Sequence, residues 1–331
     1  MPLCLNYNTG ELGSQEEFEL IDGHRDWRKR KVMSIKVSKL MRKYDPERAD
    51  LIRRCGTYLG FRQTPDGKRN LETANFCRQR LCPMCQWRRS LRLSVQADKI
   101  YRALAARGYK FVFVTVTLRN CSGVDLLDTC EEMYRRAAEF QRSRRFKESF
   151  AGFYRAFEIT YNECKGTYHP HFHYLMAVTP EYFAPESPIY WTTDLLIKRW
   201  RKAAHLDYDP SVSVEAVRQK EGQSITSACV ELCNYPAKTA EINQSGVLRF
   251  IDLALRSRRL IAWGGVVADV RRELSLEDVE DGDLVHADDE RTEYDEDAAK
   301  VVYVWRHGLY LPLDLATVRE IREAEEYENT Q

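Results

Sequence analysis

Apolar and β-branched positions along the middle of the chain predict a β-sheet. Residues 110–118 read Lys-Phe-Val-Phe-Val-Thr-Val-Thr-Leu, a composition that favours a strand. The same criteria predict strands at residues 152–161, 168–178 and 212–217. Near the end, residues 301–306 and 309–313 predict a hairpin around His307-Gly308.

Helical periodicity accounts for most of the remaining chain. Residues 126–146 place apolar side chains at helical spacing, and a basic helix over residues 86–106 ends before Gly108. Further helices are predicted at residues 34–44, 193–204, 224–241 and 248–263. Pro236 interrupts the third of these, because proline lacks an amide donor and disfavours helical geometry before it.

The order strand, helix, hairpin, helix, strand predicts an α+β fold, with an antiparallel β-sheet and flanking helices. We divide the chain into a basic region with a cysteine cluster (1–108), a central core (109–265) and an acidic C-terminal extension (266–331). No apolar run approaches the roughly 18 residues of a membrane span, and the N-terminus lacks the order of a secretory signal. The sequence therefore predicts a cytoplasmic protein without a membrane partner.

The formal net charge of +1 hides a strong asymmetry. Residues 25–110 hold roughly 24 basic and 7 acidic residues, whereas residues 271–331 hold roughly 19 acidic and 7 basic ones. A basic surface attracts a polyanion, because each phosphate contact releases counterions. The acidic stretch, densest at residues 288–297, is predicted to form a loop that can compete with DNA for that surface.

The strand at residues 168–178 carries the most chemistry. Alternate side chains of a strand share a face, so His171 and His173 point the same way, opposite to Phe172 and Tyr174. Two imidazoles on a rigid strand suit a divalent metal that keeps open coordination positions.

The preceding strand offers a third ligand. A two-residue turn at Lys165-Gly166 would set Thr160 opposite His171 and Glu158 opposite His173, with Glu158 beside both imidazoles. His169 lies on the same face and competes for this role. A slip of one residue would move Glu158 to the other face.

A cysteine cluster suggests a second metal. Cys77, Cys82 and Cys85 follow a C-x4-C-x2-C spacing, and Cys55 is the plausible fourth ligand of a structural Zn²⁺. Buried free thiols and a redox pair are the alternatives. The other cysteines show no ligand spacing. Arginines around the cluster predict a phosphate-contacting surface, with Trp87 available to stack on a base; they are Arg78, Arg80, Arg88, Arg89 and Arg92.

These motifs and their order resemble the HUH endonuclease superfamily, whose two histidines around a hydrophobic residue correspond here to His171-Phe172-His173. The closer resemblance is to rolling-circle plasmid replication initiators with a single catalytic tyrosine and a partner glutamate. The matching blocks are the cysteine cluster, residues 113–118, 154–160, the histidine strand, 231–238 and 258–264.

The resemblance implies a site-specific single-stranded DNA endonuclease and strand transferase that requires Mn²⁺ or Mg²⁺. Tyr235 would attack a phosphodiester and become linked to the 5′-phosphate, Glu231 would activate water or the incoming 3′-hydroxyl, and Lys238 would neutralise negative charge. Pro236 puts a shared helical face for Glu231 and Tyr235 in doubt. The implied partners are single-stranded or hairpin DNA at a replication origin, with a host helicase and polymerase as further candidates.

Three alternatives stay open. His169, His171 and His173 also fit a histidine triad of nucleotide hydrolases and transferases, with His171 as nucleophile. A DNA-binding module with a structural zinc would explain the charge but not the histidine strand. A transposase or a relaxase would share the nicking chemistry, although relaxases usually carry the tyrosine ahead of the histidines.

Overall fold

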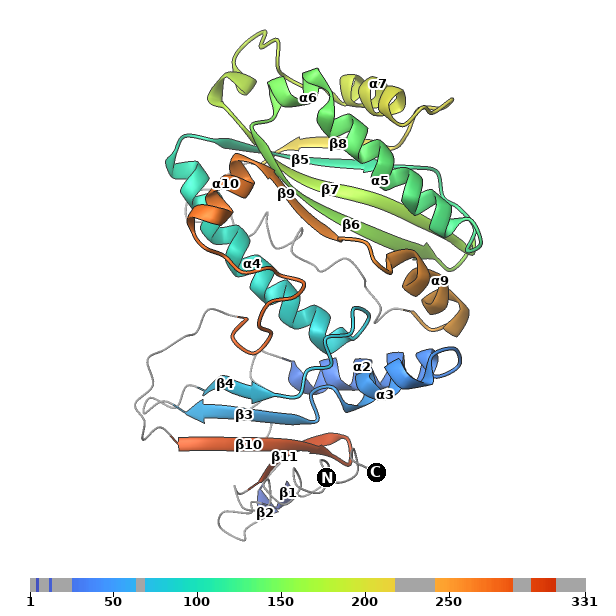
Figure 1. Ribbon diagram of the computed structural model, residues 1–331, viewed down its shortest axis with the longest axis vertical. Coiled ribbons are helices and arrows are strands. Elements are labelled where there is room, and N and C mark those ends of the chain that lie inside the picture. Colours follow the sequence, from blue (N-terminus) through green and yellow to red (C-terminus); the bar gives the residue numbers. More distant parts are fainter. Residues whose placement is uncertain are drawn as a thin grey trace. The chain divides into compact units, whose positions relative to one another are not determined.

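The computed structural model describes residues 4–5, 12–13, 26–63, 69–217, 242–287 and 299–313 (Figure 1). The chain forms two compact units, Met1–Arg89 with Asp283–Gln331, and Ser90–Gly282. This grouping differs from the three predicted segments, because the two ends of the chain share one sheet. One boundary between the two units lies within helix α4 (Pro83–Ala106), whereas the predicted segments meet at residues 108 and 109.

The second unit contains a five-stranded antiparallel sheet in the order β8-β5-β7-β6-β9. Its strands are β5 (Lys110–Thr117), β6 (Gly152–Asn162), β7 (Thr167–Val178), β8 (Val212–Ala216) and β9 (Ile261–Gly265). Besides residues 90–106 of α4, its helices are α5 (Leu126–Arg142), α6 (Arg144–Ser149), η2 (Pro180–Phe183), α7 (Thr193–Ala203), α9 (Ser245–Leu255) and α10 (Val266–Glu273). The predicted α+β class with an antiparallel sheet is confirmed. No helix in the described ranges has the length and apolarity of a membrane crossing.

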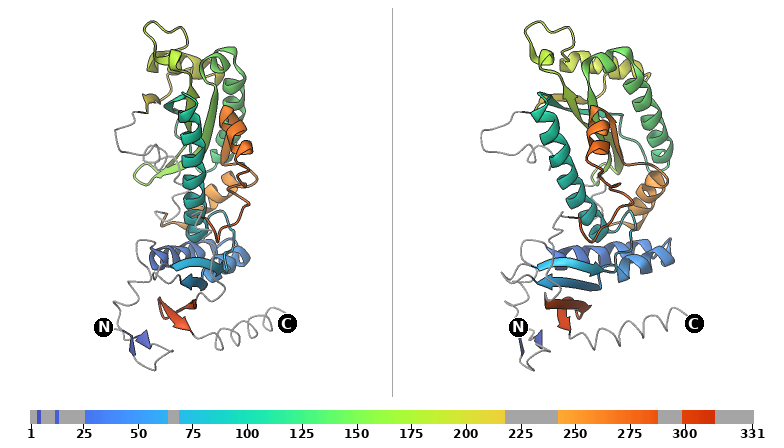
Figure 2. Two further views of the ribbon diagram at one scale, coloured as in Figure 1. Left: turned by 90° about the vertical axis from the view of Figure 1, so that its left-hand side faces the viewer. Right: turned by 60° about the vertical axis from the view of Figure 1, so that its left-hand side comes forward.

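Helices cover both faces of this sheet, and Figure 2 shows it between α4 and α5. On one face, the ring of Tyr134 from α5 packs at 4.9 Å from Phe157 and 5.0 Å from Phe172. On the other face, the Tyr101 hydroxyl of α4 donates to the Leu175 carbonyl at 2.9 Å. Since side chains alternate along a strand, His171 and His173 lie on the face that α4 covers, farther along β7.

The predicted helix over residues 248–263 is only half correct. Helix α9 ends at Leu255, and Ser257 takes a φ of 58° that stops helical geometry. Residues 261–265 then pair with β6 as an edge strand. A Cβ at Gly264 would lie 2.4 Å from the Phe153 ring and one at Gly265 2.2 Å from the Ala151 carbonyl oxygen. The two glycines therefore permit a close pairing that a sequence pattern does not reveal.

The first unit holds a four-stranded sheet in the order β11-β10-β3-β4. Its elements are α2 (Trp27–Met41), α3 (Pro46–Arg54), β3 (Tyr58–Gln63), β4 (Arg69–Ala74), β10 (Ala299–Arg306) and β11 (Leu309–Leu313), with a short pair of β1 (Cys4–Leu5) and β2 (Leu12–Gly13). The predicted hairpin around His307-Gly308 is confirmed. Both turn residues have positive φ, at 50° and 80°, as a two-residue type I′ turn requires.

Aromatic side chains build the core of the first unit. Trp27 of α2 is 2% exposed, and its ring meets Phe61 of β3 edge-to-face at 5.9 Å. Phe61 in turn contacts Tyr303 of β10 at 5.8 Å. Residues 299–313 thus complete a core that also contains residues of α2 and β3.

Candidate metal centres and active site

One glutamate and two histidines converge on the α4 side of the five-stranded sheet. Glu158 projects from β6, and His171 and His173 project from the neighbouring strand β7. The Nε2 atoms of both histidines lie 3.4 Å from Glu158 Oε2. The ligand atoms of all three residues lie within 4.8 Å of one another. We call these three residues the HHE cluster.

The strand register brings Glu158 to this position by a different pairing from the predicted one. Glu158 faces His171, and His173 faces Ala156, whereas Glu158 opposite His173 and Thr160 opposite His171 were predicted. The connection has four residues, 163–166, rather than two, which shifts the pairing by two positions. A two-residue shift leaves every side chain on its original face, so Glu158 still projects beside both imidazoles.

Both histidines of the HHE cluster make a contact through Nδ1, the ring nitrogen that points away from Glu158. His171 Nδ1 lies 3.0 Å from the His169 carbonyl oxygen, which can only accept, so Nδ1 carries a proton and, in the neutral ring, Nε2 presents a lone pair. That lone pair faces a carboxylate oxygen, and the two repel each other unless a cation lies between them. His173 Nδ1 is held at 3.0 Å from Thr115 Oγ1. The donor set therefore fits a divalent cation, with both imidazole rings oriented by hydrogen bonds at Nδ1.

His169, the competing ligand, lies outside the HHE cluster among the described residues. Its ring stacks on His171 with centroids 5.1 Å apart. Burial, followed by the charge of His171, lowers the pKa of His169 below its ordinary value. The position fits a packing role beside the cluster.

Thr115→Val is expected to weaken divalent-metal binding at the HHE cluster by about 10- to 100-fold, because His173 loses the hydroxyl that orients its ring. Isothermal titration with Mn²⁺ measures the change. Thr117→Val is the matched control, since its hydroxyl donates to the Ser211 carbonyl instead. Equal losses in both variants would show that the Thr115 contact does not support the ligand.

The four predicted cysteine ligands come together in the first unit. Cys55, Cys77, Cys82 and Cys85 place their sulfur atoms within 4.8 Å of one another. Cys85 Sγ lies 3.6 Å from Cys55 Sγ and 3.7 Å from Cys77 Sγ. Four sulfurs at about 2.3 Å from a tetrahedral Zn²⁺ lie about 3.8 Å apart. The cluster therefore has the dimensions of a zinc site, and these separations are too long for disulfides.

Polar groups around the cysteines also match a metal thiolate centre. Lys31 is fully buried, and its Nζ donates to the carbonyls of Cys55 and Arg53 at 2.7 and 2.6 Å. Burial lowers the pKa of Lys31 to about 8, while the nearby cysteines oppose the shift. Ser34 Oγ lies 3.6 Å from Cys82 Sγ. A buried ammonium beside four cysteines offsets the negative charge that thiolate ligands carry.

The predicted arginine surface is only partly at the surface. Arg88, Arg89 and Arg92 are at most 8% exposed. Arg88 donates to the Leu284 and Val285 carbonyls, Arg89 to those of Arg78 and Gln79, and Arg92 pairs with Glu277. These three guanidinium groups bind protein groups, in contrast to the prediction. Phosphate contact by Arg78, which is exposed, and by Arg80 stays a prediction. The Trp87 ring packs on Trp27 at 4.6 Å.

The acidic stretch is partly bound to basic side chains as well. In the second unit, Glu277 pairs with Arg92 and Glu273 pairs with Arg107. The densest part, residues 288–297, lies outside the described residues. Competition of that part with DNA stays a prediction.

Comparison with known proteins identifies the family. A family model described as "Replication protein" matches residues 68–310. This chain belongs to the replication-protein family. It is 32% identical over 287 residues to "Protein rep" of Streptococcus pneumoniae serotype 2 (strain D39 / NCTC 7466), covering 85% of this chain and 89% of the relative. It is 36% identical over 275 residues to "Protein rep" of Bacillus sp, covering 75% and 87%.

A third relative, "Protein rep" of Lactiplantibacillus plantarum, is 34% identical over 295 residues and covers 85% of this chain and 92% of its own length. No solved structure matches the chain. The family confirms the resemblance to rolling-circle plasmid replication initiators of the HUH superfamily and supports a role in plasmid replication.

The predicted nucleophile and its neighbours lie outside the described residues. Tyr235, Glu231, Lys238 and Pro236 all fall within residues 218–241. Their roles stay predictions. Thr115 and Trp263 have no functional role in the predictions from sequence, although both lie on the same face of the sheet as the HHE cluster. Strand alternation from His173 could have placed Thr115 there once the pairing of β5 with β7 was known.

Proposed function

We propose that this member of the family is a site-specific single-stranded DNA endonuclease and strand transferase that initiates rolling-circle replication through a 5′-phosphotyrosine intermediate at Tyr235. The observation that carries the proposal is the HHE cluster, in which two imidazole nitrogens face one carboxylate oxygen at 3.4 Å. The cluster is partly exposed, with 24% of the His173 side chain open to solvent, so a phosphate can reach it.

The proposed reaction exchanges one phosphoester for another. The Tyr235 oxygen attacks the phosphorus of the scissile phosphodiester, the bond to the 3′-oxygen breaks, and the leaving strand takes up a proton as a 3′-hydroxyl. Tyr235 loses its proton to a base, and Lys238 offsets the resulting negative charge. In the closing step, Glu231 removes a proton from water or from an incoming 3′-hydroxyl, which displaces tyrosine from the phosphate.

Glu158, His171 and His173 would hold Mn²⁺ or Mg²⁺ at this site. The chemistry that such an ion supplies when bound is polarisation of the scissile phosphate. The residues of the chain position it: β6 and β7 fix the three ligands, while Thr115 and the His169 carbonyl orient the rings. Cys55, Cys77, Cys82 and Cys85 would hold a structural Zn²⁺ in the first unit, with Lys31 offsetting the thiolate charge.

The experiment that tests this function looks for a covalent complex. The full chain is incubated with single-stranded hairpin oligonucleotides from its own replicon, with Mn²⁺ or with EDTA, and analysed under denaturing conditions. We expect an adduct only with Mn²⁺, and peptide mass spectrometry is expected to find the nucleotide on Tyr235.

Other outcomes would point to the alternatives. Tight binding that weakens steeply with salt, with no adduct on any strand, would support a non-enzymatic DNA-binding module. Hydrolysis of a nucleotide substrate in EDTA would support a histidine-triad enzyme. Insertion of a DNA end into a new target, without replication of a plasmid that carries the origin, would support a transposase.

A further inference from the structure

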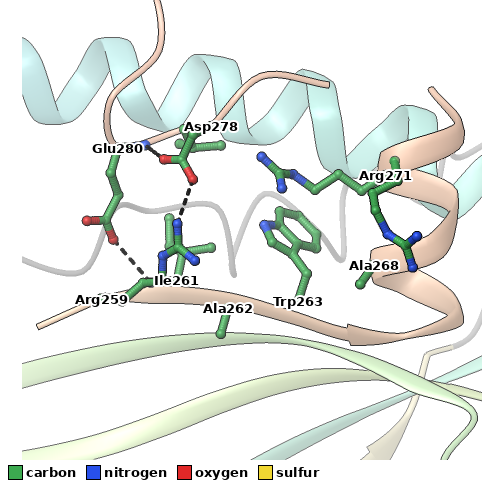
Figure 3. A pocket seen from close by; sticks show the side chains of 10 residues that line it. Arg259, Ile261, Ala262, Trp263, Ala268, Arg271, Asp278 and Glu280 are labelled. Carbon is green, nitrogen blue, oxygen red and sulfur yellow. Dashed lines mark hydrogen bonds and ion pairs between the residues drawn. The ribbon is translucent and has the colours of Figure 1, made fainter. Parts of the chain in front are cut away.

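A cavity of about 200 Å³ lies along the edge strand β9 in the second unit (Figure 3). Its floor is Ile261 and Trp263, and its walls come from Arg259, Arg271, Asp278 and Glu280. Residues 258–264 belong to a block that resembles the replication initiators, yet the proposed nicking reaction gives it no role. Arg258 has a structural explanation, since it binds the Ala254 carbonyl and Glu131.

The strand register places this cavity on the same face of the sheet as the HHE cluster. Trp263 pairs with Tyr154, and Ile261 pairs with Ala156. Tyr154, Ala156 and Glu158 alternate along β6, so all of them share the face that Glu158 occupies. Trp263 lies one strand across from Tyr154, and Glu158 lies four residues beyond Tyr154 along β6. Strand geometry therefore separates Trp263 from Glu158 by about 14 Å. A single DNA strand with its phosphate at the cluster can reach the cavity within a few nucleotides.

The cavity combines an aromatic surface with a cationic group. The Trp263 ring is half-buried and is supported from the sheet by Tyr154, with centroids 4.7 Å apart. The Arg271 guanidinium lies over the indole, 6.0 Å from its centroid, and extends into the cavity (Figure 3). One Arg271 nitrogen donates to the Glu277 carbonyl, while its Nε is buried and has no hydrogen-bond partner among the residues that the structure describes. A buried unsatisfied donor is costly, and an acceptor on a ligand would relieve it.

The opposite wall is rigid and acidic. Asp278 accepts hydrogen bonds from Arg259 at 3.0 Å and from the Glu280 amide at 2.8 Å. Glu280 Oε1 accepts from the Leu260 and Ile261 amides at 2.8 and 3.4 Å. These contacts tie the wall to the start of β9, so the cavity is formed before a ligand arrives. A flat aromatic floor with fixed donors and acceptors at its rim suits a nucleobase, which has a π-face and a polar edge.

We propose that this cavity binds one base of the single-stranded DNA substrate, a few nucleotides from the scissile phosphate, stacked on Trp263 with Arg271 donating to an acceptor on its edge. The inference rests on the proposed function for the identity of the strand. It assigns the block at residues 258–264 a role in positioning the strand and in sequence preference.

The test combines an abasic scan with substitution of Trp263. Labelled oligonucleotides from the replicon, each with one abasic position, are titrated against the wild-type chain and Trp263→Ala without added Mn²⁺ or Mg²⁺, where no cleavage competes. We expect one position at which base removal weakens wild-type binding on the order of tenfold. Trp263→Ala should lose a similar factor on the intact strand and be insensitive to base removal at that position. Trp263→Phe, which keeps an aromatic ring, should remain sensitive.

Phe183→Ala is the matched control, because Phe183 is an aromatic residue that is 40% exposed and lies outside the cavity. It should show the wild-type abasic pattern. If base removal weakens binding by the same factor in Trp263→Ala as in the wild-type chain at every position, the proposal is overturned. Saturable binding of deoxynucleoside monophosphates that depends on Trp263, without an abasic-sensitive position, would assign the cavity to free nucleotides and overturn it too.

The two proposals can fail separately. An abasic pattern that depends on Trp263 in a protein that forms no adduct would reject the nicking function and keep the base-binding cavity. An adduct on a protein without such a pattern would keep the nicking function and reject the cavity.

Discussion

Tyr235→Phe is expected to leave the affinity for origin single strands unchanged and to abolish the covalent adduct. The substitution removes one hydroxyl, and phenylalanine offers no oxygen to form a bond to phosphorus. The ring stays, so contacts that depend on its shape are retained. Binding is measured by fluorescence anisotropy without added Mn²⁺ or Mg²⁺, and adduct formation by denaturing electrophoresis in Mn²⁺.

Tyr190→Phe is the matched control for this substitution, because Tyr190 is 45% exposed and has no role in the proposed reaction. It should form the adduct at the wild-type rate. An adduct that survives in Tyr235→Phe would keep the enzyme class and move the nucleophile to another residue, and a distortion of the chain at Pro236 would then be the first explanation to examine.

The HHE cluster can be tested in the same assay. His171→Ala should slow adduct formation by about 10²- to 10³-fold or more, because charge stabilisation at the phosphate is lost. His169→Ala should have a small effect, since His169 lies outside the close group of ligand atoms. Equal losses in the two variants would mean that His169 takes part in the site.

Loss of zinc from the four-cysteine cluster is expected to destabilise the first unit. Stripping the metal, or the substitution Cys85→Ser, should lower the free energy of unfolding of the first unit by several kcal/mol, because binding energy at a structural zinc site is folding energy. Cys55 and Cys85 are buried, and the site ties the end of α3 to the start of α4. Hydrogen exchange should show faster exchange in α2, α3 and β3.

Elemental analysis should find one zinc per wild-type chain and none in Cys85→Ser. Cys164→Ser is the control, since Cys164 is exposed and lies outside both metal groups. It should keep its zinc and its stability. A wild-type chain with no zinc, and a Cys85→Ser variant as stable as Cys164→Ser, would show that the four cysteines are free thiols.

Local patterns in the amino-acid sequence predict which side chains share a face of a strand and which cysteines have the spacing of metal ligands. Alternation along residues 168–178 places His171 and His173 together whatever the sheet around them, because the geometry of a strand is local. Glu158 joined them despite a wrong register, since an error of two residues preserves the face. The two turn residues of the β10–β11 hairpin are likewise a local requirement.

Features that depend on residues far apart in the chain follow from the three-dimensional fold and not from local patterns. The pairing of Tyr303 with Leu59 joins β10 and β3, which lie more than 200 residues apart in the chain, in one sheet. The sequence predicts that Arg88 belongs to a phosphate-contacting surface, but its buried guanidinium donates to the carbonyls of Leu284 and Val285. The sequence pattern predicts that Trp263 is helical, but residues 261–265 form a strand because the edge of β6 provides backbone hydrogen-bond partners. Burial and strand pairing are set by the partner segment, and a local pattern carries no information about which segment that will be.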